Sequence, residues 1–277
     1  MRQVLWIGLI ACLMLMPALA QEKQFSETLP FTSGERLTVD AYKGTIHISS
    51  WDRQEVEVIA TVEAPSDLDG EYARRIVDAT EVRIRQTASG VSIKSDYDDV
   101  PSRREGWFWG SSKTLPYVHY QIRAPRSLNL KVDDYKSDIE IYGVEGRIDL
   151  ETYKGRVEAR DLVGELRLET YKGTVDLSGV RGGLDIETYK GRVIAEIDSI
   201  EADSRLNTYK GNITLVMNSE QGLDLDADLS RRADLHSDFD LRTRGNISRK
   251  DFRSTINGGG PRLRVSSYKG DISLKRR

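Results

Sequence analysis

Residues 151–191 read ETYKGRVEARDLVGELRLETYKGTVDLSGVRGGLDIETYKG, so the pentapeptide ETYKG begins at positions 151, 169 and 187. The whole chain contains seven Tyr-Lys pairs, which hold seven of its twelve tyrosines. The pairs begin at positions 42, 135, 153, 171, 189, 209 and 268, and all but the second precede glycine. Self-similarity with a period of about 20 residues is typical of a solenoid, in which successive turns of the chain stack.

Each repeat contains two short runs of alternating apolar and polar residues. Val157 and Ala159 share one face of the first run, and Leu166, Leu168 and Thr170 share one face of the second. Alternation with a period of two predicts half-buried strands. Two strands cannot form a stable sheet alone, so we expect each to pair with its counterpart one turn away. The sequence therefore predicts an all-β, single-stranded parallel β-solenoid with about 18–20 residues per repeat.

The Tyr-Lys-Gly segments mark the corners of this solenoid. The inward-facing Thr152 and Val157 are five positions apart, an odd number that a straight strand cannot satisfy. Glycine adopts backbone angles that are closed to other residues, which suits a sharp bend. Structural turns are predicted at Gly44, Gly155, Gly173, Gly191, Gly211 and Gly270.

Stacked repeats place the Tyr-Lys pairs in outward-facing columns, for which two interpretations remain open. The structural one is a ladder, in which rings stack and lysines offset the repulsion between neighbouring glutamates. The functional one is a binding strip for a polymer such as a glycan, with tyrosine rings against sugar faces and lysines against carboxylates. The candidate strip comprises Tyr135, Tyr153, Lys154, Tyr171, Lys172, Tyr189, Lys190, Tyr209 and Lys210.

Residues 1–20 have the features of a secretory signal peptide. An apolar run follows Arg2, and a small-residue cleavage motif ends at Ala20. Cys12, the only cysteine, offers an alternative, in which its lipidation anchors the chain as a lipoprotein. We expect an exported protein, periplasmic or at the cell surface, with no transmembrane segment after cleavage and no disulfide.

The remaining chain is divided into an N-terminal β region, residues 21–125, which caps the solenoid, and the repeat array, residues 126–277. A short helix is expected at residues 70–79 of the cap. The array is expected to end in an exposed last strand, where the basic residues 275–277 discourage end-to-end pairing.

An irregular loop, residues 96–116, interrupts the N-terminal region and contains the segment GWFWG. Its aromatic residues, Trp107, Phe108 and Trp109, are candidates for packing over an open end of the solenoid. Contact with a partner or a membrane is the alternative interpretation of this cluster.

Composition and motifs argue against several functional classes. The chain has 41 basic and 44 acidic residues, so it lacks the basic surplus of a nucleic-acid-binding protein. His47, His119 and His236 are far apart and show no metal-ligand spacing, and no nucleophile-elbow, zinc-protease or phosphate-loop motif is present. The sequence predicts neither a cofactor nor a catalytic residue.

A run of aspartates near the C-terminus raises one alternative to this prediction. Asp224, Asp226 and Asp228 alternate with apolar residues and can share an exposed face, and residues 234, 238 and 240 are aspartates as well. Clustered carboxylates are the ligands that calcium prefers. The usual calcium-binding repeats are absent from the sequence, so we predict no metal site.

Several segments, taken in order, resemble the bacterial "putative adhesin" family of exported β-strand-repeat proteins. They are LTVDAYKG (37–44), Trp51-Asp52, YQIRAP (120–125), the G-x-[IV] repeats, NGGGP (257–261) and SSYKGDISL (266–274). The resemblance covers nearly all of residues 31–277. It implies a β-solenoid, a periplasmic or surface location and a domain of unknown function, and it implies no catalytic residues.

We therefore expect a non-catalytic exported β-solenoid that serves as an adhesin-like or envelope scaffold and interaction module. Its partner is unidentified, and an envelope protein or a glycan is the candidate. The alternative is a carbohydrate-active β-helix of the polysaccharide lyase or hydrolase type, or a glycan-binding protein that uses the Tyr-Lys columns.

Overall fold

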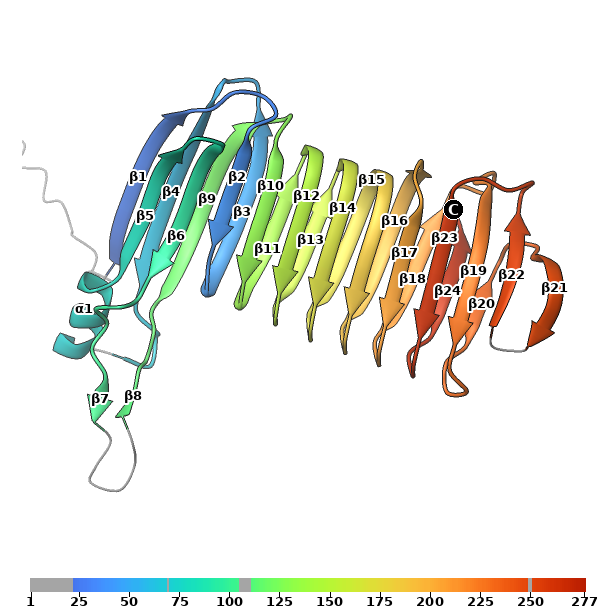
Figure 1. Cartoon of the computed structure of the whole chain (residues 1–277). Helices are drawn as coiled ribbons and strands as arrows, with labels where there is room; N and C mark the ends of the chain where they lie inside the picture. The colour runs from blue at the N-terminus through green and yellow to red at the C-terminus, as the bar shows by residue number, and fades with distance from the viewer. Residues whose placement is uncertain (1–21, 69, 105–110, 249–250) are drawn as a thin grey trace, which may run out of the picture.

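The computed structural model of the chain describes residues 22–68, 70–104, 111–248 and 251–277. These residues form an all-β structure with one short helix, α1 (Gly70–Asp78), as Figure 1 shows. The predicted all-β class is confirmed, and so is the short helix expected from residue 70. The strands lie side by side in a long row, with the N-terminal strands at one end and the C-terminal strands at the other (Figure 1).

The row is built from rungs, each consisting of the strand before a Tyr-Lys corner and the strand after it. The central rungs are β10 (Asn129–Asp134) with β11 (Lys136–Tyr142), β12 (Glu145–Thr152) with β13 (Arg156–Arg160), β14 (Val163–Thr170) with the first part of β15 (Thr174–Thr188), the last part of β15 with β16 (Arg192–Ile200), and β17 (Ser204–Thr208) with β18 (Asn212–Met217).

Each central strand pairs in parallel with the equivalent strand of the next rung. Leu150 lies beside Leu168, and Leu168 lies beside Ile186, so equivalent residues are in register across rungs. Strands before the corners pair with one another, as do strands after them. Their inward side chains, such as Val157 and Leu166, are fully buried in one continuous core. The 18-residue period thus translates directly into strand pairing.

Two further rungs enter the row out of chain order. β2 (Arg36–Asp40) and β3 (Lys43–Trp51) lie between the first central rung and two strands that follow them in sequence, β6 (Gly90–Asp96) and β9 (Tyr117–Pro125). β23 (Arg262–Ser267) and β24 (Ile272–Arg276) lie between the last central rung and the pair β19 (Leu223–Leu229) and β20 (Leu235–Ser237). The expectation of an exposed last strand is wrong, because β24 pairs on both sides.

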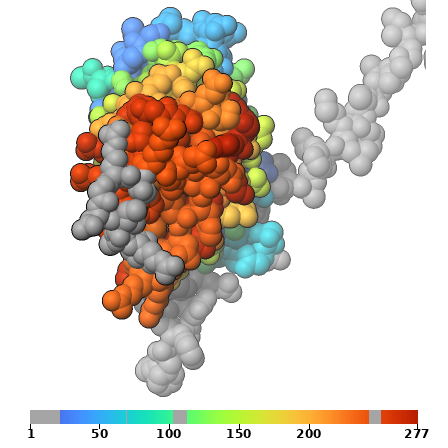
Figure 2. Space-filling view, turned by 90° about the vertical axis from the view of Figure 1, so that its right-hand side faces the viewer, coloured from blue at the N-terminus to red at the C-terminus, as the bar shows by residue number. Residues whose placement is uncertain are grey.

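Antiparallel strands extend the sheet at both ends of the row, beyond β6, β9 and β19, whereas β20 pairs among the described strands with β24 alone. β4 (Glu55–Glu63) pairs with β1 (Glu22–Pro30) and β9, and β5 (Glu81–Thr87) pairs with β6. At the other end, seen face-on in Figure 2, β22 (Asp251–Ile256) pairs with β19 and β21 (Arg242–Ser248). β7 (Arg103–Arg104) and β8 (Ser111–Ser112) form a small separate ribbon.

The sheet is therefore mixed, and the prediction of a purely parallel solenoid is wrong at its ends. A last parallel rung would present a row of unpaired N–H and C=O groups to other chains. Antiparallel strands, which need no continuation of the repeat, stop the parallel pairing at a defined place.

Each regular corner is held by the threonine before the Tyr-Lys pair and the glycine after it. Thr170 and Thr188 are buried, and their Oγ1 atoms accept hydrogen bonds from the backbone N–H groups of Gly173 (3.0 Å) and Gly191 (2.9 Å). A Cβ atom on Gly191 would overlap the carbonyl oxygen of Gly173. Close stacking of successive corners therefore requires glycine at position 191. Gly155 is needed for a second reason, because its φ of 144° disfavours other residues.

Candidate functional site

Seven tyrosines form one continuous stack along the margin of the row, which we call the tyrosine ladder. Its members are Tyr42, Tyr135, Tyr153, Tyr171, Tyr189, Tyr209 and Tyr268, with neighbouring ring centroids 4.6–5.0 Å apart and ring planes inclined by 3–12°. This spacing equals the distance between paired strands, so the ladder follows directly from the strand register.

The two ends of the ladder come from the inserted rungs. The candidate strip predicted from the sequence comprises Tyr135 to Tyr209 and does not include Tyr42 and Tyr268, which lie in less regular flanks. Both tyrosines begin a Tyr-Lys-Gly motif like those of the central corners. This motif could have predicted that they join the same stack.

The ladder covers the faces of its own rings. Each inner ring, such as Tyr171, has a neighbour stacked on both sides, and Tyr97 packs edge-on against Tyr42 at 6.0 Å. The surface of the ladder interior therefore presents ring edges rather than ring faces. A sugar ring stacked on a tyrosine face, the contact of the binding-strip interpretation, has no free face in the ladder interior. The stacked rings are those of the ladder interpretation.

A shallow groove runs beside the ladder. It consists of two adjoining hollows of about 500 and 460 Å³, which share Glu187 and Tyr189. The tyrosine rings form one wall, and buried threonines of the corners, such as Thr152 and Thr170, lie at its floor. The groove extends over consecutive rungs from Asp134 to Tyr268.

The second wall is a column of side chains that lie two residues before each ladder tyrosine. We call it the carboxylate column, and its members are Asp40, Asp133, Glu151, Glu169 and Glu187, continued by Asn207 and Ser266. Asp40 and Asp133 lie outside the lining of the groove, which begins in this column at Glu151. Like charges on directly paired residues destabilise a sheet. The column is acidic from Asp40 to Glu187, uncharged at Asn207 and Ser266, and acidic again at Asp228, which pairs with Ser266 and also lines the groove.

Salt bridges offset only part of this repulsion. Lys131 lies 2.9 Å from Asp133, and Arg167 contacts Glu169. Within the part of the chain that the structure describes, no salt bridge reaches Glu151 or Glu187.

The neighbouring column, two residues earlier in each strand, has the opposite design. Its charges alternate along the row through Lys131, Asp149, Arg167, Asp185 and Arg205. Arg205 forms two hydrogen bonds of 2.8 Å with Asp185 in the adjacent rung. Two of its basic residues, Lys131 and Arg167, form their salt bridges with Asp133 and Glu169 of the carboxylate column.

The lysines of the Tyr-Lys pairs do not line the groove. Lys172, Lys190 and Lys210 are exposed, and each Nζ lies 5.4 Å from the ring centroid of the tyrosine that precedes it. Such cation–π contacts contribute about 0.5–1 kcal/mol each at exposed sites. The predicted strip is therefore divided, since its tyrosines line the groove while Lys154 and these three lysines do not.

The corner at Tyr135 differs from the other central corners in its chemistry. Asp134 and Ser137 replace the usual threonine and glycine, and Asp134 accepts hydrogen bonds from the Ser137 N–H (2.7 Å), the Ser137 hydroxyl (2.6 Å) and the Thr152 hydroxyl (3.0 Å). Burial raises the pKa of the Asp134 carboxyl, and the hydrogen bonds oppose this shift. Asp134 lines one end of the groove beside Tyr135 and is not among the site residues predicted from the sequence.

The sequence of nearly the whole chain identifies its family. The model of the Toastrack DUF4097 family, a domain of unknown function, matches residues 19–275. The chain belongs to the Toastrack family. The resemblance to "putative adhesin" proteins stated from the sequence is thereby confirmed.

Solved structures similar to this Toastrack chain have low sequence identity to it. A "putative cell adhesion protein" from Clostridium sporogenes is 13% identical, with 92% of this chain and 100% of that chain covered and a TM-score of 0.39. A "putative lipid binding protein" from Parabacteroides distasonis is 10% identical, with 91% and 96% covered and a TM-score of 0.44. A "putative adhesin" from Bacteroides fragilis is 9% identical, with 92% and 97% covered and a TM-score of 0.34. No curated protein matches the chain.

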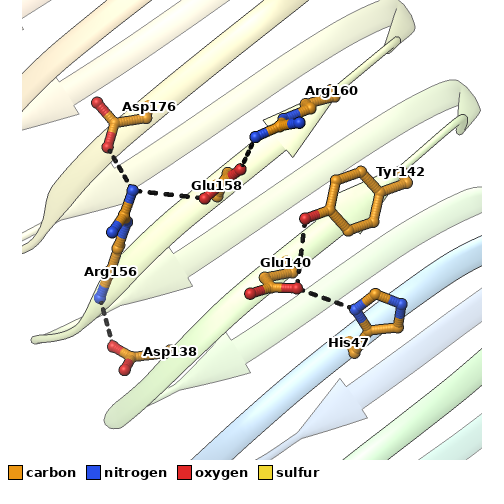
Figure 3. Close-up of polar contacts among 8 residues, drawn as sticks. All are labelled: His47, Asp138, Glu140, Tyr142, Arg156, Glu158, Arg160 and Asp176. Atoms are coloured by element: carbon orange, nitrogen blue, oxygen red, sulfur yellow. Dashed lines mark hydrogen bonds and ion pairs between the residues drawn. The ribbon is translucent and has the colours of Figure 1, made fainter.

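The opposite face of the Toastrack array carries a network of paired charges (Figure 3). His47 Nδ1 lies 3.1 Å from a carboxylate oxygen of Glu140, and the Arg156 guanidinium lies 3.4 Å from Glu158 and 3.5 Å from Asp176. Here each basic group faces a carboxylate on its own or a neighbouring strand. In this pairing of opposite charges, the face is similar to the alternating column and differs from the groove.

The described residues contain no group of three or more His, Cys, Asp or Glu side chains that could hold a metal ion. In the aspartate run, Asp226 lies 3.8 Å from Arg253 and 3.9 Å from Arg264, and Asp224 accepts a hydrogen bond from Thr255 (3.4 Å). These carboxylates are engaged in contacts within the sheet.

Two predictions fall outside the described residues. Trp107, Phe108 and Trp109 of the GWFWG segment are among residues 105–110, and the expected signal peptide with Cys12 is among residues 1–21. Within the described ranges, the structure has no helix long and apolar enough to cross a membrane.

Proposed function

We propose that this Toastrack protein is a non-catalytic, exported, adhesin-like interaction module of the cell envelope. Its β-solenoid-like array serves as a rigid scaffold, and an extended ligand lies along the groove beside the tyrosine ladder. The observation that carries the proposal is the continuity of this groove over successive rungs, from Asp134 to Tyr268. Solenoid proteins commonly use extended surfaces of this kind for binding.

The repetition of the groove favours binding over catalysis. A catalytic centre brings different side chains together at one place, usually with perturbed pKa values. The groove instead offers almost the same side chains from rung to rung, a tyrosine, a carboxylate and a threonine.

An envelope glycan is the ligand that we favour. The ladder interior offers no ring face for stacking, so recognition would rely on hydrogen bonds to sugar hydroxyls. Asn207 and Ser266 supply an amide and a hydroxyl, joined by a 2.9 Å hydrogen bond, and the wall carboxylates supply acceptors. Export is supported by the signal-peptide features of residues 1–20.

Cosedimentation with peptidoglycan sacculi tests the proposal. We expect the chain to bind sacculi saturably, and the double variant N207A/S266A to bind several-fold more weakly. The matched control is T214A/S273A, because Thr214 and Ser273 are paired residues of the same two rungs on the opposite face. Equal binding by both variants would contradict the groove site, and release of soluble sugar fragments would contradict a non-catalytic role.

A further inference from the structure

The groove has a shape that repeats at a fixed interval. Its ladder wall advances by 4.6–5.0 Å per rung with nearly parallel rings, and its acidic wall follows the same register. A flat, rigid molecule laid parallel to the row would therefore meet the same contacts on each rung. Tyr135, Tyr153, Tyr171 and Tyr189 line the acidic half of the groove continuously.

Ring edges are the part of the ladder that such a molecule would touch. The edge of an aromatic ring is electropositive and its face is electronegative, so edge-to-face contacts between rings are favourable. A planar aromatic ligand can thus lie with its face across the edges of successive tyrosines. A saturated or branched molecule cannot make this contact over several rungs.

The second wall selects the charge of the ligand. Glu151 and Glu187 line the groove and have no salt-bridge partner among the described residues, while the exposed lysines lie outside the groove lining. A positive charge on the ligand would offset the repulsion within the carboxylate column, and a negative charge would add to it.

We propose that the groove between the tyrosine ladder and the carboxylate column binds flat, elongated aromatic cations, with their long axis parallel to the ladder. This inference goes beyond the proposed function, because it depends on the ladder edges and Glu151 and Glu187, and not on the identity of an envelope partner. The two proposals share the groove but are tested at different residues, since the glycan test substitutes Asn207 and Ser266 and leaves Glu151 and Glu187 in place.

Titration with thioflavin T, a flat cationic dye, tests this site in the intact chain. The dye becomes fluorescent when rotation between its two ring systems is restricted, so we expect a saturable rise in fluorescence. The affinity should fall as salt is added, because screening weakens attraction between exposed charges. An anionic planar dye of similar length should bind much more weakly.

The double variant E151Q/E187Q separates the site from non-specific adsorption. We expect thioflavin T affinity to fall about fivefold, the size expected when two exposed ion contacts are lost. The matched control is E165Q/E196Q, which removes the same charge from two exposed carboxylates outside this groove. Equal loss in both variants would mean that net charge alone attracts the dye, which would overturn the proposal.

A ladder variant tests the aromatic wall. Y171L interrupts the row of ring edges in the middle of the groove, and we expect it to abolish most of the fluorescence rise. Circular dichroism shows whether the variant is folded. If Y171L unfolds, the E151Q/E187Q variant still tests the proposal through the acidic wall of the groove. Unchanged dye binding in a folded Y171L variant would overturn the proposal.

Discussion

The central rungs and the inserted rung β23–β24 are built alike but reach their places differently. Equivalent residues of central rungs are 18 or 20 positions apart, whereas Ser266 lies 59 positions from its partner Asn207. Nevertheless the Tyr209–Tyr268 and Tyr153–Tyr171 centroid distances are both 4.8 Å. A rung is thus placed by the fit of its corner to the next corner and not by its order in the chain.

Alanine substitutions of corner glycines, one in the inserted rung and one in a central rung, should cause the largest loss of stability. A Cβ atom at Gly270 would overlap the carbonyl oxygen of Gly211, and one at Gly211 would overlap that of Gly191. We expect G270A and G211A each to destabilise the chain by about 3 kcal/mol or more, because backbone atoms must move apart. Urea denaturation followed by circular dichroism measures the change.

The matched control for both variants is G183A. A Cβ atom at Gly183 would meet the Ala202 Cβ at 3.4 Å and the Asp203 carbonyl oxygen at 3.9 Å, both ordinary van der Waals contacts, so the change should stay within about 1 kcal/mol. A stable G270A together with an unstable G211A would mean that the inserted rung is held more loosely than a central one.

Serine substitutions in the ladder should have an intermediate effect that depends on position. Tyr171 stacks on two tyrosines, whereas the stacking partner of Tyr268 in the described chain is Tyr209. Since an aromatic pair contributes about 0.5–1.5 kcal/mol, Y171S should lose about twice as much stacking energy as Y268S. Thermal unfolding of the two variants compares them, and a larger loss for Y268S would contradict an additive ladder.

The smallest effect is expected at the irregular corner, and it depends on pH. Burial raises the pKa of Asp134 above its ordinary value of 3.8, so the folded chain retains this proton to higher pH than the unfolded chain. The resulting stabilisation is fully present below about pH 3.8 and is lost as the pH rises through the folded-state pKa.

The double variant D134T/S137G converts this corner to the regular form and should remove that pH-dependent term. Urea midpoints of both proteins, measured from acid to neutral pH, give the difference. Parallel curves would show that Asp134 does not titrate differently in the folded chain.

Much of the site could be predicted from local sequence patterns. Alternating residues such as Val157 and Ala159 indicated the buried faces, and the Tyr-Lys repeats indicated a stacked column. The covered ring faces could not be predicted, because they depend on the ring geometry of neighbouring rungs. The contrast between the carboxylate column and the alternating column likewise needed the register, since both lie on the same strands.

The sequence by itself determined the period, the faces of the strands and the corners, because these depend on residues within one or two repeats. Only the tertiary structure decided where Tyr42 and Tyr268 join the ladder and how antiparallel strands end the row. The reason is physical: strand pairing depends on hydrogen bonds and side-chain fit between rungs, and these interactions are indifferent to the length of chain that connects them. A local pattern can specify a rung, but which rungs become neighbours depends on which pairs of rungs fit each other best.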